Sequence, residues 1–377
     1  MIRSYKIRLY PTKQQEELMW RHVGACRYIY NYMLAKQNEI REAGGKHLSA
    51  FDMINLLKPL KNDGEHAWLY DISNASLTRS CQDLHAAYNK FFRKQNGFPK
   101  FKSKKRSKSN FPVRENIYFT ESVVTISKIG KVRYRTDFDI PFGRGHKFSN
   151  PRVSNRSGKW FLTFGMEREN QTPQLSDKPM GIDLGIKDLV TAAYGDERIV
   201  FHNINKSKRV RFLKRKIAHT QRSISRKYEA NRIGKRYVKT GNILREEEKL
   251  RSLYERLSDI RTNYTHQTTH ALVSKLPYRV VMEDLNVKGM MKNKHLSKAI
   301  AEQEFAEFIR QMKYKCEERG IEFVQADRFF PSSKTCSCCG NIKHDLKLSD
   351  RTYVCDECGY TEDRDFNAAV NLMRYAA

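Results

Sequence analysis

The stretch Met180-Gly-Ile-Asp-Leu-Gly185 decides the fold, because it reads as a short apolar strand that carries one acidic residue, Asp183. A second apolar strand is predicted at residues 279–285, and it carries Glu283. An amphipathic helix follows, and a further strand is predicted at residues 321–326. A strand–helix–strand unit with a right-handed crossover forms a parallel pair, so this half of the chain is predicted to be α/β.

Three carboxylates stand out around this pattern. Asp183 and Glu283 lie in otherwise apolar strands, where a charge is costly unless a cation or a partner neutralises it. Asp365 lies at the predicted start of a helix whose small alanines allow close packing on a sheet. Each acid has an ordinary alternative role, as a turn residue, a strand-end charge or a helix cap. Three in this order favour a shared site for two divalent ions ~4 Å apart, which suits phosphodiester hydrolysis.

Two Cys-x-x-Cys arms form the strongest local motif. The arms are Cys336 to Cys339 and, after 15 residues, Cys355 to Cys358. Four thiolates at this spacing can surround one structural Zn²⁺ ion tetrahedrally. The alternative is a pair of disulfides or a redox motif, which matched arms disfavour. Cys338 is a spare residue that does not fit the spacing.

The composition favours a polyanionic partner. The 377 residues include 71 Lys or Arg against 42 Asp or Glu, a formal net charge of +29, and nucleic acid is the usual partner of so basic a chain. No run approaches the ~18 apolar residues of a membrane helix, and the charged start lacks the apolar core of a secretory signal. Cys26, Cys81 and Cys316 stand alone and are expected in the core, as in a reduced, intracellular protein.

The positive charge is concentrated in two segments. Residues 90–114 hold ten Lys or Arg and no acid, and residues 206–251 hold 17 Lys or Arg against four Glu. Such segments are expected to contact phosphates. Among the lysines of the first segment lie four phenylalanines that either stack on unpaired bases or belong to the core: Phe91, Phe92, Phe98 and Phe101. The second segment is helical in its spacing, with breaks expected at Gly234 and Gly241.

The N-terminal part is predicted to begin with a strand at residues 4–10. Thr12 and Gln15 then form a capping box, and helical structure is expected to about Arg93. Short strands are predicted at residues 123–126, 132–135 and 160–165. A domain boundary is placed in the polar linker 170–178.

The chain resembles the TnpB family, the transposon-encoded ancestors of the type V CRISPR effector nucleases. The resemblance rests on MGIDLG (180–185), VVMEDLNVKGMMKNKHLSKAI (280–300), FFPSSKTCSCCG (329–340) and CGYTEDRDFNAAVN (358–371), with similar segments at 5–20 and 97–105. It implies an α/β fold with a RuvC-like (RNase H fold) nuclease domain interrupted by a zinc ribbon. A wedge-like β-barrel with an inserted helical recognition lobe would precede it. The implied ranges are 1–10 and 116–170 for the barrel, 11–115 for the lobe, 179–335 and 360–377 for the nuclease, and 336–359 for the ribbon.

The resemblance also implies an activity and its residues. Asp183, Glu283 and Asp365 match the family's carboxylate ligands for two catalytic Mg²⁺ ions, and Cys336, Cys339, Cys355 and Cys358 match the ligands of one structural Zn²⁺ ion. Asp363 is expected to cap the helix, although one sequence does not settle whether it shares the ligand role. The implied partners are a guide RNA from the transposon end and double-stranded target DNA cut beside a short flanking motif, with no membrane. The implied location is the prokaryotic cytoplasm, at the nucleoid.

Two other functions use the same residues. A DNA transposase would join DNA ends with the same acidic site, and an RNA that co-purifies with the protein would exclude it. A non-catalytic RNA-guided repressor usually lacks one acid, whereas all three are present here. Cleavage that depends on Mg²⁺ would exclude the repressor.

Overall fold

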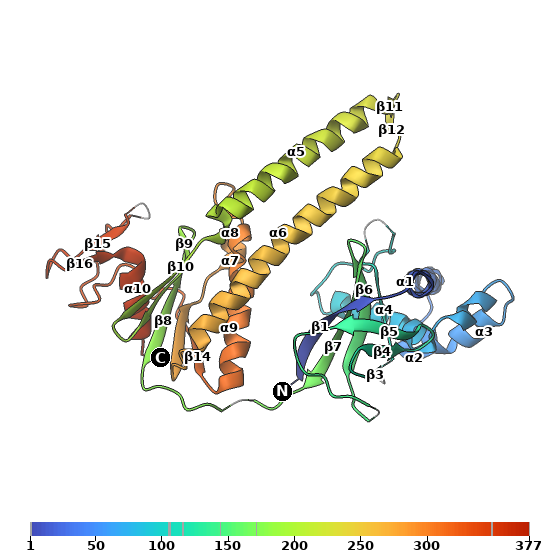
Figure 1. The fold of residues 1–377 in the computed structure, drawn as a ribbon, viewed down its shortest axis with the longest axis horizontal. Helices are drawn as coiled ribbons and strands as arrows, with labels where there is room; N and C mark the ends of the chain where they lie inside the picture. Colours follow the sequence, from blue (N-terminus) through green and yellow to red (C-terminus); the bar gives the residue numbers. More distant parts are fainter. Residues whose placement is uncertain are drawn as a thin grey trace. The chain divides into compact units, whose positions relative to one another are not determined.

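The computed structural model describes residues 2–104, 107–114, 117–143, 145–170, 172–347 and 350–376. It consists of two compact units, Met1–Arg168 and Glu169–Ala377, which appear in blue to green and in green to red in Figure 1. None of the described helices combines the length and the apolar character that crossing a bilayer requires.

The N-terminal unit is built on one seven-stranded antiparallel sheet with the order β2-β6-β7-β1-β5-β4-β3. Strand β1 lies at its centre, paired with β7 on one side and β5 on the other. Ile7 and Leu9 of β1 are buried, whereas Lys6 and Tyr10 on the opposite face are exposed, as the period of two in a strand requires. The strands are β1 (Ile2–Tyr10), β2 (Asn110–Pro112), β3 (Tyr118–Phe119), β4 (Val123–Ile126), β5 (Gly130–Arg135), β6 (Ser149–Arg156) and β7 (Lys159–Glu167).

The predicted strands at 4–10, 123–126, 132–135 and 160–165 are confirmed as parts of β1, β4, β5 and β7. Three strands of this sheet, β2, β3 and β6, were not predicted. β6 is polar apart from Pro151 and Val153, so it shows little alternation. β2 lies inside the range expected to be helical, 11–115, because Phe111 is needed in the core of the sheet. Closure of this sheet into a wedge-like β-barrel stays a prediction.

The helices of this unit follow β1 and form a cluster with its own apolar core. The predicted capping box is confirmed: Thr12 Oγ1 accepts from the Gln15 amide at 3.3 Å, and Gln15 Oε1 accepts from the Thr12 amide at 3.0 Å. The last long helix ends at Phe92, as expected. The helices are α1 (Lys13–Glu42), α2 (Ala50–Asn55), α3 (Leu57–Lys61), the 3₁₀ helix η1 (Ala67–Asp71) and α4 (Asn74–Phe92).

The C-terminal unit contains a five-stranded sheet with the order β10-β9-β8-β13-β14. β13 is parallel to both β8 and β14, which confirms the predicted parallel pair, and β9 is antiparallel to its neighbours. Met282 lies opposite Ile182, so the next residues along, Glu283 and Asp183, meet at the same end of the sheet. The strands are β8 (Pro179–Leu184), β9 (Asp188–Tyr194), β10 (Glu197–His202), β13 (Arg279–Glu283) and β14 (Glu322–Ala326).

Helices cover both faces of this sheet (Figure 1). Val280 and Met282 pack with the apolar face of α9 (Phe305–Arg319), whereas Val281 packs with α10 (Arg364–Met373) on the other side. Gly181 allows α10 to approach, because a Cβ at this residue would lie 2.0 Å from the Ala369 carbonyl oxygen. The close packing expected from the alanines of this helix is therefore observed. The remaining short elements are η2 (Ile204–Lys206), α7 (Val287–Met290) and α8 (Ser297–Gln303).

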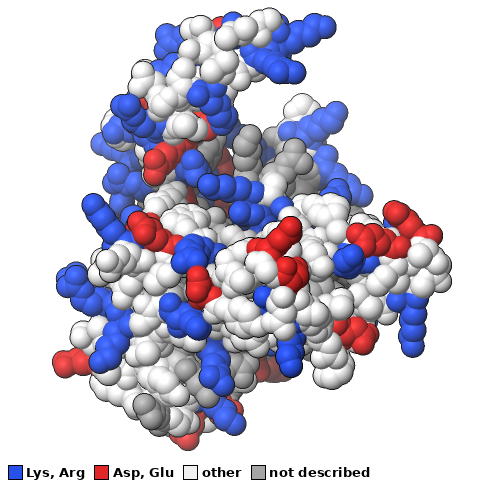
Figure 2. Space-filling view, turned by 90° about the vertical axis from the view of Figure 1, so that its right-hand side faces the viewer, with Lys and Arg blue, Asp and Glu red and all other residues white. Residues whose placement is uncertain are grey.

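The basic segment 206–251 forms most of a long helical hairpin. Helix α5 (Lys208–Ala230) leads to a small turn of β11 (Arg232–Ile233) and β12 (Arg236–Tyr237), and α6 (Gly241–Val273) returns. The two predicted breaks are confirmed: Gly234 has φ +59° in the turn, and Gly241 is the first residue of α6, after the cap Thr240. Lys and Arg side chains project from the tip of this hairpin, at the top of Figure 2.

Candidate active site and metal centre

Asp183 lies near the end of β8 and is surrounded by other charged groups. Its side chain remains partly accessible, yet protein atoms enclose it densely. Burial is the main cause that raises the pKa of Asp183 well above its ordinary value, and the carboxylates of Glu283 and Asp365 raise it further. Arg364 opposes this shift. The charged form of Asp183 is therefore under-compensated by the protein, as expected of a cation ligand.

Glu283 ends β13, next to β8 in the sheet. Its Oε1 atom accepts a hydrogen bond from the Ser332 hydroxyl, which fixes the orientation of the carboxylate. The neighbouring Asp284 is paired with Arg328 instead. Of these two neighbouring acids, it is therefore Glu283 that belongs to the same cluster as Asp183.

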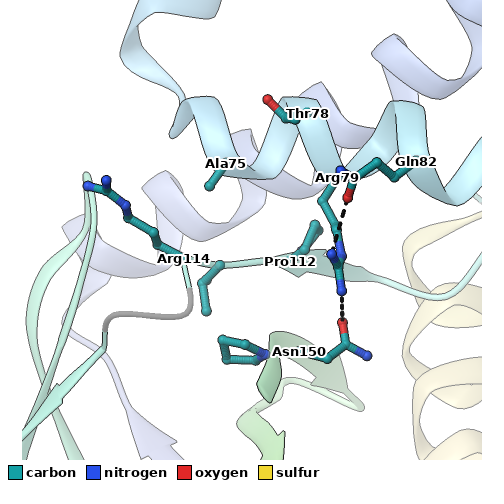
Figure 3. Close-up of a pocket in the computed structure, with 9 residues that line it drawn as sticks. Ala75, Thr78, Arg79, Gln82, Pro112, Arg114 and Asn150 are labelled. Atoms are coloured by element: carbon teal, nitrogen blue, oxygen red, sulfur yellow. Dashed lines mark hydrogen bonds between the residues drawn. The ribbon is translucent and has the colours of Figure 1, made fainter. Parts of the chain in front are cut away.

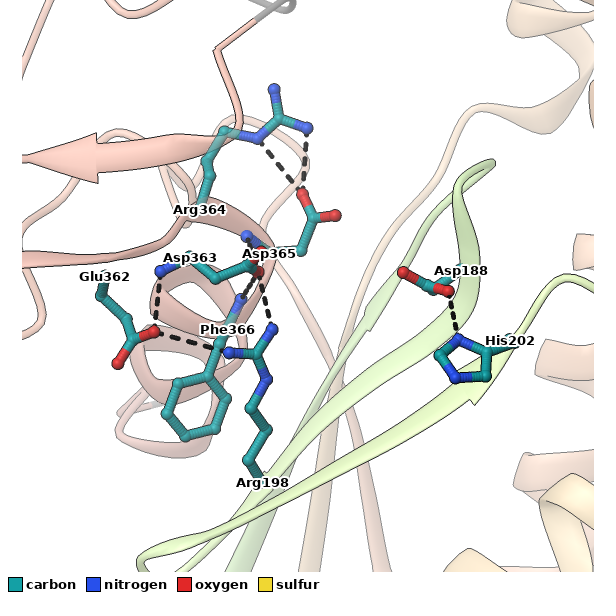
Figure 4. Close-up of polar contacts among 8 residues, drawn as sticks. All are labelled: Asp188, Arg198, His202, Glu362, Asp363, Arg364, Asp365 and Phe366. Carbon is teal, nitrogen blue, oxygen red and sulfur yellow. Dashed lines mark hydrogen bonds and ion pairs between the residues drawn. The ribbon is translucent and has the colours of Figure 1, made fainter.

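Asp365 lies in the first turn of α10, and Asp363 is the N-cap of that helix. The Asp363 Oδ1 atom accepts from the amides of Asp365 and Phe366, both at 3.1 Å, which is the capping role expected for it. Arg364 Nη2 lies 3.0 Å from Asp365 Oδ1, and the other carboxylate oxygen faces the turn after β8, 4.0 Å from the position of a Cβ at Gly185. Figure 4 shows these side chains at the start of the helix.

The fold thus brings the three acids to one end of the sheet, near enough for the two others to shift the pKa of Asp183. Among the described residues, only the four cysteines have all their ligand atoms within 4.8 Å of one another. The carboxylate oxygens of the three acids are spaced more widely than the four sulfurs. A wider spacing suits two ions about 4 Å apart, because the ligands must then reach both ions. Carboxylate oxygens are the donors that Mg²⁺ prefers, so the donor set fits such ions.

The four cysteines of the two arms form a compact cluster. The Sγ atoms of Cys336 and Cys358 are 3.7 Å apart, and those of Cys339 and Cys355 are 3.5 Å apart. Zn–S bonds of about 2.3 Å place tetrahedral sulfurs about 3.8 Å from one another, so the cluster fits zinc. The Cys358 amide donates to Cys355 and, with a smaller contribution from the Glu357 amide, lowers the pKa of that thiol to about 6.

The ribbon around these cysteines has the turns that its glycines predict. Gly340 and Gly359 have φ of +81° and +68°, which a residue without Cβ adopts at little cost. The strands β15 (Thr352–Val354) and β16 (Thr361–Asp363) pair next to them. The paired hairpin therefore runs beyond the predicted limit of the ribbon at residue 359 and leads directly into α10.

Two buried asparagines on α10 connect this helix to the segment before the first cysteine arm, a role that the sequence interpretation missed. Asn371 Nδ2 donates to the carbonyls of Ser332 at 2.8 Å and Thr335 at 2.7 Å. Asn367 donates to Thr335 at 2.7 Å and accepts from the Ser337 amide at 2.9 Å. Their spacing of four on one helix face was the available signal. Because Ser332 also orients Glu283, the same segment supports both clusters.

The segment 90–114 combines exposed and packed aromatic rings. Phe92 and Phe101 are 61% and 59% exposed, and both remain available to stack on bases. Phe91 and Phe98 contact each other in an edge-on arrangement, with centroids 5.3 Å apart, and are partly buried. Lys105 and Arg106 lie outside the described residues.

A polar cavity of about 300 Å³ lies in the N-terminal unit between α4 and the strands β2 and β6. Arg79 spans it, donating to Gln82 Oε1 at 3.1 Å and to Asn150 Oδ1 at 3.3 Å (Figure 3). Arg114 also lines this cavity. This cavity belongs to the N-terminal unit, whereas the acidic cluster belongs to the C-terminal unit.

The lone cysteines are confirmed as core residues. Burial raises the pKa of Cys26 to about 11 and those of Cys81 and Cys316 to about 12, so these thiols are unreactive at neutral pH. His266 on α6 is also partly buried, and burial lowers its pKa; neither it nor His270 belongs to the compact cluster of metal-type ligands found among the described residues.

Comparison with known proteins gives matches along the chain. Residues 1–46 match a family described as a helix-turn-helix domain, residues 163–294 one described as a probable transposase, and residues 305–372 one described as the Cas12f1-like TNB domain. The chain is 31% identical to the putative RNA-guided DNA endonuclease InsQ of Escherichia coli (strain K12), over 99% of this chain and 92% of the relative. It is 30% identical to a putative RNA-guided DNA endonuclease of Streptomyces pristinaespiralis, over 98% and 88%.

The fold resembles that of a solved nuclease complex. A chain in the cryo-EM structure of the Cas12f1–sgRNA–target DNA complex superposes with a TM-score of 0.60 at 14% identity, covering 99% of this chain and 98% of that one. At this identity the likeness concerns the fold alone.

Proposed function

Because the chain belongs to the TnpB family of transposon-encoded RNA-guided DNA endonucleases, we propose that Asp183, Glu283 and Asp365 form its metal-dependent catalytic centre within a RuvC-like nuclease domain. The protein is an RNA-guided DNA endonuclease. One observation carries the proposal of the site: Asp183 lies among two further carboxylates, at a sheet end where its charge is under-compensated.

Two of the three acids, Glu283 and Asp365, are each held by a neighbouring side chain. The Ser332 hydroxyl holds the carboxylate of Glu283. Arg364 holds one oxygen of Asp365 and leaves the other directed toward the turn after β8. Two Mg²⁺ ions bound by these oxygens would activate the attacking water and stabilise the leaving oxygen of a phosphodiester. The protein's own contribution is to orient the carboxylates and to hold them close together, although their proximity raises the pKa of Asp183.

The four-cysteine cluster supports one structural Zn²⁺ ion, because four protein ligands close the coordination sphere. The ribbon would thereby fix the position of α10, to which the asparagine contacts connect it. The basic segments support binding of a guide RNA and of double-stranded DNA through phosphates, since base pairing with the guide supplies the sequence specificity. We propose that the guide comes from the transposon end and that the target is nucleoid DNA in a prokaryotic cytoplasm.

The test is cleavage of a guide-matched plasmid by the purified complex, with and without Mg²⁺. Asp183→Ala should lower the cleavage rate by at least about 10³-fold, as expected for loss of a catalytic group, and should leave guide RNA binding unchanged. The matched control is Asp196→Ala, because Asp196 is an exposed acid in the turn at the opposite end of the same sheet. If Asp183→Ala still cut matched DNA, the assignment of the catalytic centre would be wrong.

A transposase is the second candidate, because residues 163–294 match a family described as a probable transposase. Sequencing of the RNA that co-purifies with the chain separates the two functions. A bound RNA that directs cleavage to its complement supports the endonuclease, whereas strand joining without RNA supports the transposase.

A further inference from the structure

The turn between β8 and β9 is held rigidly by side chains from outside it. The backbone carbonyl of each of its three residues, Gly185 to Lys187, accepts a hydrogen bond from a side chain. Gln303 donates to the Gly185 oxygen at 3.0 Å, Asn203 to the Ile186 oxygen at 2.8 Å, and Lys206 to the Lys187 oxygen at 2.9 Å. The turn begins two residues after Asp183, so whatever it presents has a fixed position relative to the acidic cluster.

A β-bulge next to this turn orients a histidine. Phe201 pairs with Val190, but the register then shifts and His202 lies opposite Asp188 instead of Leu189. His202 Nδ1 lies 2.7 Å from Asp188 Oδ1, while 85% of the histidine side chain is exposed. The two side chains face each other at the ends of their strands in Figure 4. Bulges of this kind are frequent beside active sites, where they redirect a side chain.

The surface around this histidine is a cavity of about 520 Å³, and three of its seven lining residues are Lys or Arg. Lys187, Lys206 and Arg198 line it, against the single carboxylate of Asp188. Arg198 already contacts Asp363 at 3.2 Å and Glu362 at 3.5 Å, so it forms a wall that connects the cavity to the start of α10. Lys187 is exposed and forms no ion pair within the part of the chain that the structure describes.

We infer that Lys187, His202 and Lys206 form a second phosphate site, which holds a backbone phosphate of the DNA strand cut at the acidic cluster. The inference rests on the proposed function, since it assigns the cavity to the same substrate. Two ammonium groups are suitable donors for a phosphodiester anion, and so is an imidazolium whose Nδ1–H is held by a carboxylate and whose Nε2–H is free to donate. The site would position the strand and take no part in the chemistry.

The connection to Asp183 limits which phosphate is bound. Asp188 is five positions after Asp183. The Cα atoms of the two residues therefore lie within about 17 Å of each other even if the chain were extended. Successive phosphates of one strand rise by about 3.4 Å along a duplex. The bound phosphate should therefore lie within about five nucleotides of the cut.

The experiment replaces single phosphates of the cut strand with neutral methylphosphonates, one position at a time, and measures single-turnover cleavage by the guide-loaded protein. In the unchanged protein, one position near the cut should lower the rate about tenfold, the loss expected for a charge-assisted contact. In the double variant Lys187→Ala/His202→Ala, the unmodified DNA should be cut about tenfold more slowly, and the methylphosphonate at that position should have no further effect. Lys313→Ala, an exposed lysine on α9, should behave like the unchanged protein.

Additive losses in the double variant, or the absence of any sensitive position in the unchanged protein, would overturn the inference. The same set of substrates and variants is also measured by equilibrium binding with Ca²⁺ in place of Mg²⁺. If the unchanged protein does not cut at all, the proposed function fails, and the binding measurements still decide whether the cavity holds a phosphate.

Discussion

The four cysteines and the three carboxylates are two metal-type clusters of one unit, but the chain assembles them in opposite ways. The cysteines lie within 23 consecutive residues, from Cys336 to Cys358, and their sulfurs meet within 4.8 Å. The acids are separated by 100 and then 82 residues, and strand pairing together with helix packing brings them to one sheet end. The proposed structural site is therefore encoded locally, whereas the proposed catalytic site depends on the whole sheet.

The two clusters are nevertheless connected through one short segment. Ser332 orients Glu283, and its carbonyl accepts from Asn371 on the helix that carries Asp365. The first cysteine of the ribbon follows four residues later. The locally encoded site can thus stabilise the one that depends on the sheet, and the following predictions test that dependence.

Among the variants that test the dependence of one cluster on the other, the largest effect is expected from loss of zinc. Cys355→Ser removes a ligand, so the protein should lose its stoichiometric zinc, and cleavage should fall by at least about 100-fold although all three acids remain. The physical reason is that structural zinc contributes about 10 kcal/mol or more to the folding of small metal domains. Zinc content by elemental analysis and cleavage rate are measured together.

The matched control is Cys338→Ser, because Cys338 is exposed and lies outside the four-cysteine cluster. It should keep both zinc and activity. Equal losses in the two variants, or zinc retained in Cys355→Ser, would contradict the ligand assignment.

An intermediate effect is expected from breaking the contact between the clusters. Asn371→Ala leaves the buried Ser332 carbonyl without this donor, whereas the Thr335 carbonyl keeps Asn367, so the free energy of unfolding should fall by about 2 kcal/mol. Zinc should stay bound, because no ligand changes, while cleavage should decrease since Glu283 and Asp365 lose a common support. Urea denaturation, zinc content and cleavage are compared with Asn242→Ala, an exposed asparagine on α6. A variant that loses its zinc would show that the contact holds the ribbon together rather than connecting it to the helix.

Much of the fold follows from local patterns, and the exceptions have physical reasons. Strands β1, β8 and β13, the capping box at Thr12 and the end of α9 at Gly320 are visible in the sequence, because each depends on residues close to it. Strand β6 is not, since it is held by pairing with its neighbours and has few apolar residues of its own. Tertiary context decides such strands.

The same division holds for the site. The cysteine spacing predicted a cluster that the structure forms, and the apolar strands around Asp183 and Glu283 indicated an unusual position for a charge. The spacing of Asn367 and Asn371 indicated a shared helix face, but the partners of these asparagines and of Ser332 were not predictable, because each partner lies more than 25 positions away. The pairing of His202 with Asp188 depends on a bulge that no local pattern announces.

The smallest effect concerns the acids without their ions. Burial, and then Glu283 and Asp365, raise the pKa of Asp183 in the folded protein, whereas the unfolded chain keeps the ordinary value of about 3.9. The unfolded state therefore releases this proton first as the pH rises. The Asp183 carboxyl thus lowers the free energy of unfolding at pH values above about 3.9, and by more at pH 7.5 than at pH 5.5.

Asp183→Asn should remove this cost and increase the free energy of unfolding by about 1 kcal/mol at pH 7.5, with a smaller gain at pH 5.5. Both values are measured in Mg²⁺-free buffer that leaves zinc bound. Saturating Mg²⁺ should reverse the order, because only the carboxylate gains a ligand. Asp196→Asn serves as the exposed control and should change neither value. A variant less stable than the unchanged protein in the absence of Mg²⁺ would mean that the acidic cluster is already compensated by the chain, and the contrast with the self-contained cysteine cluster would disappear.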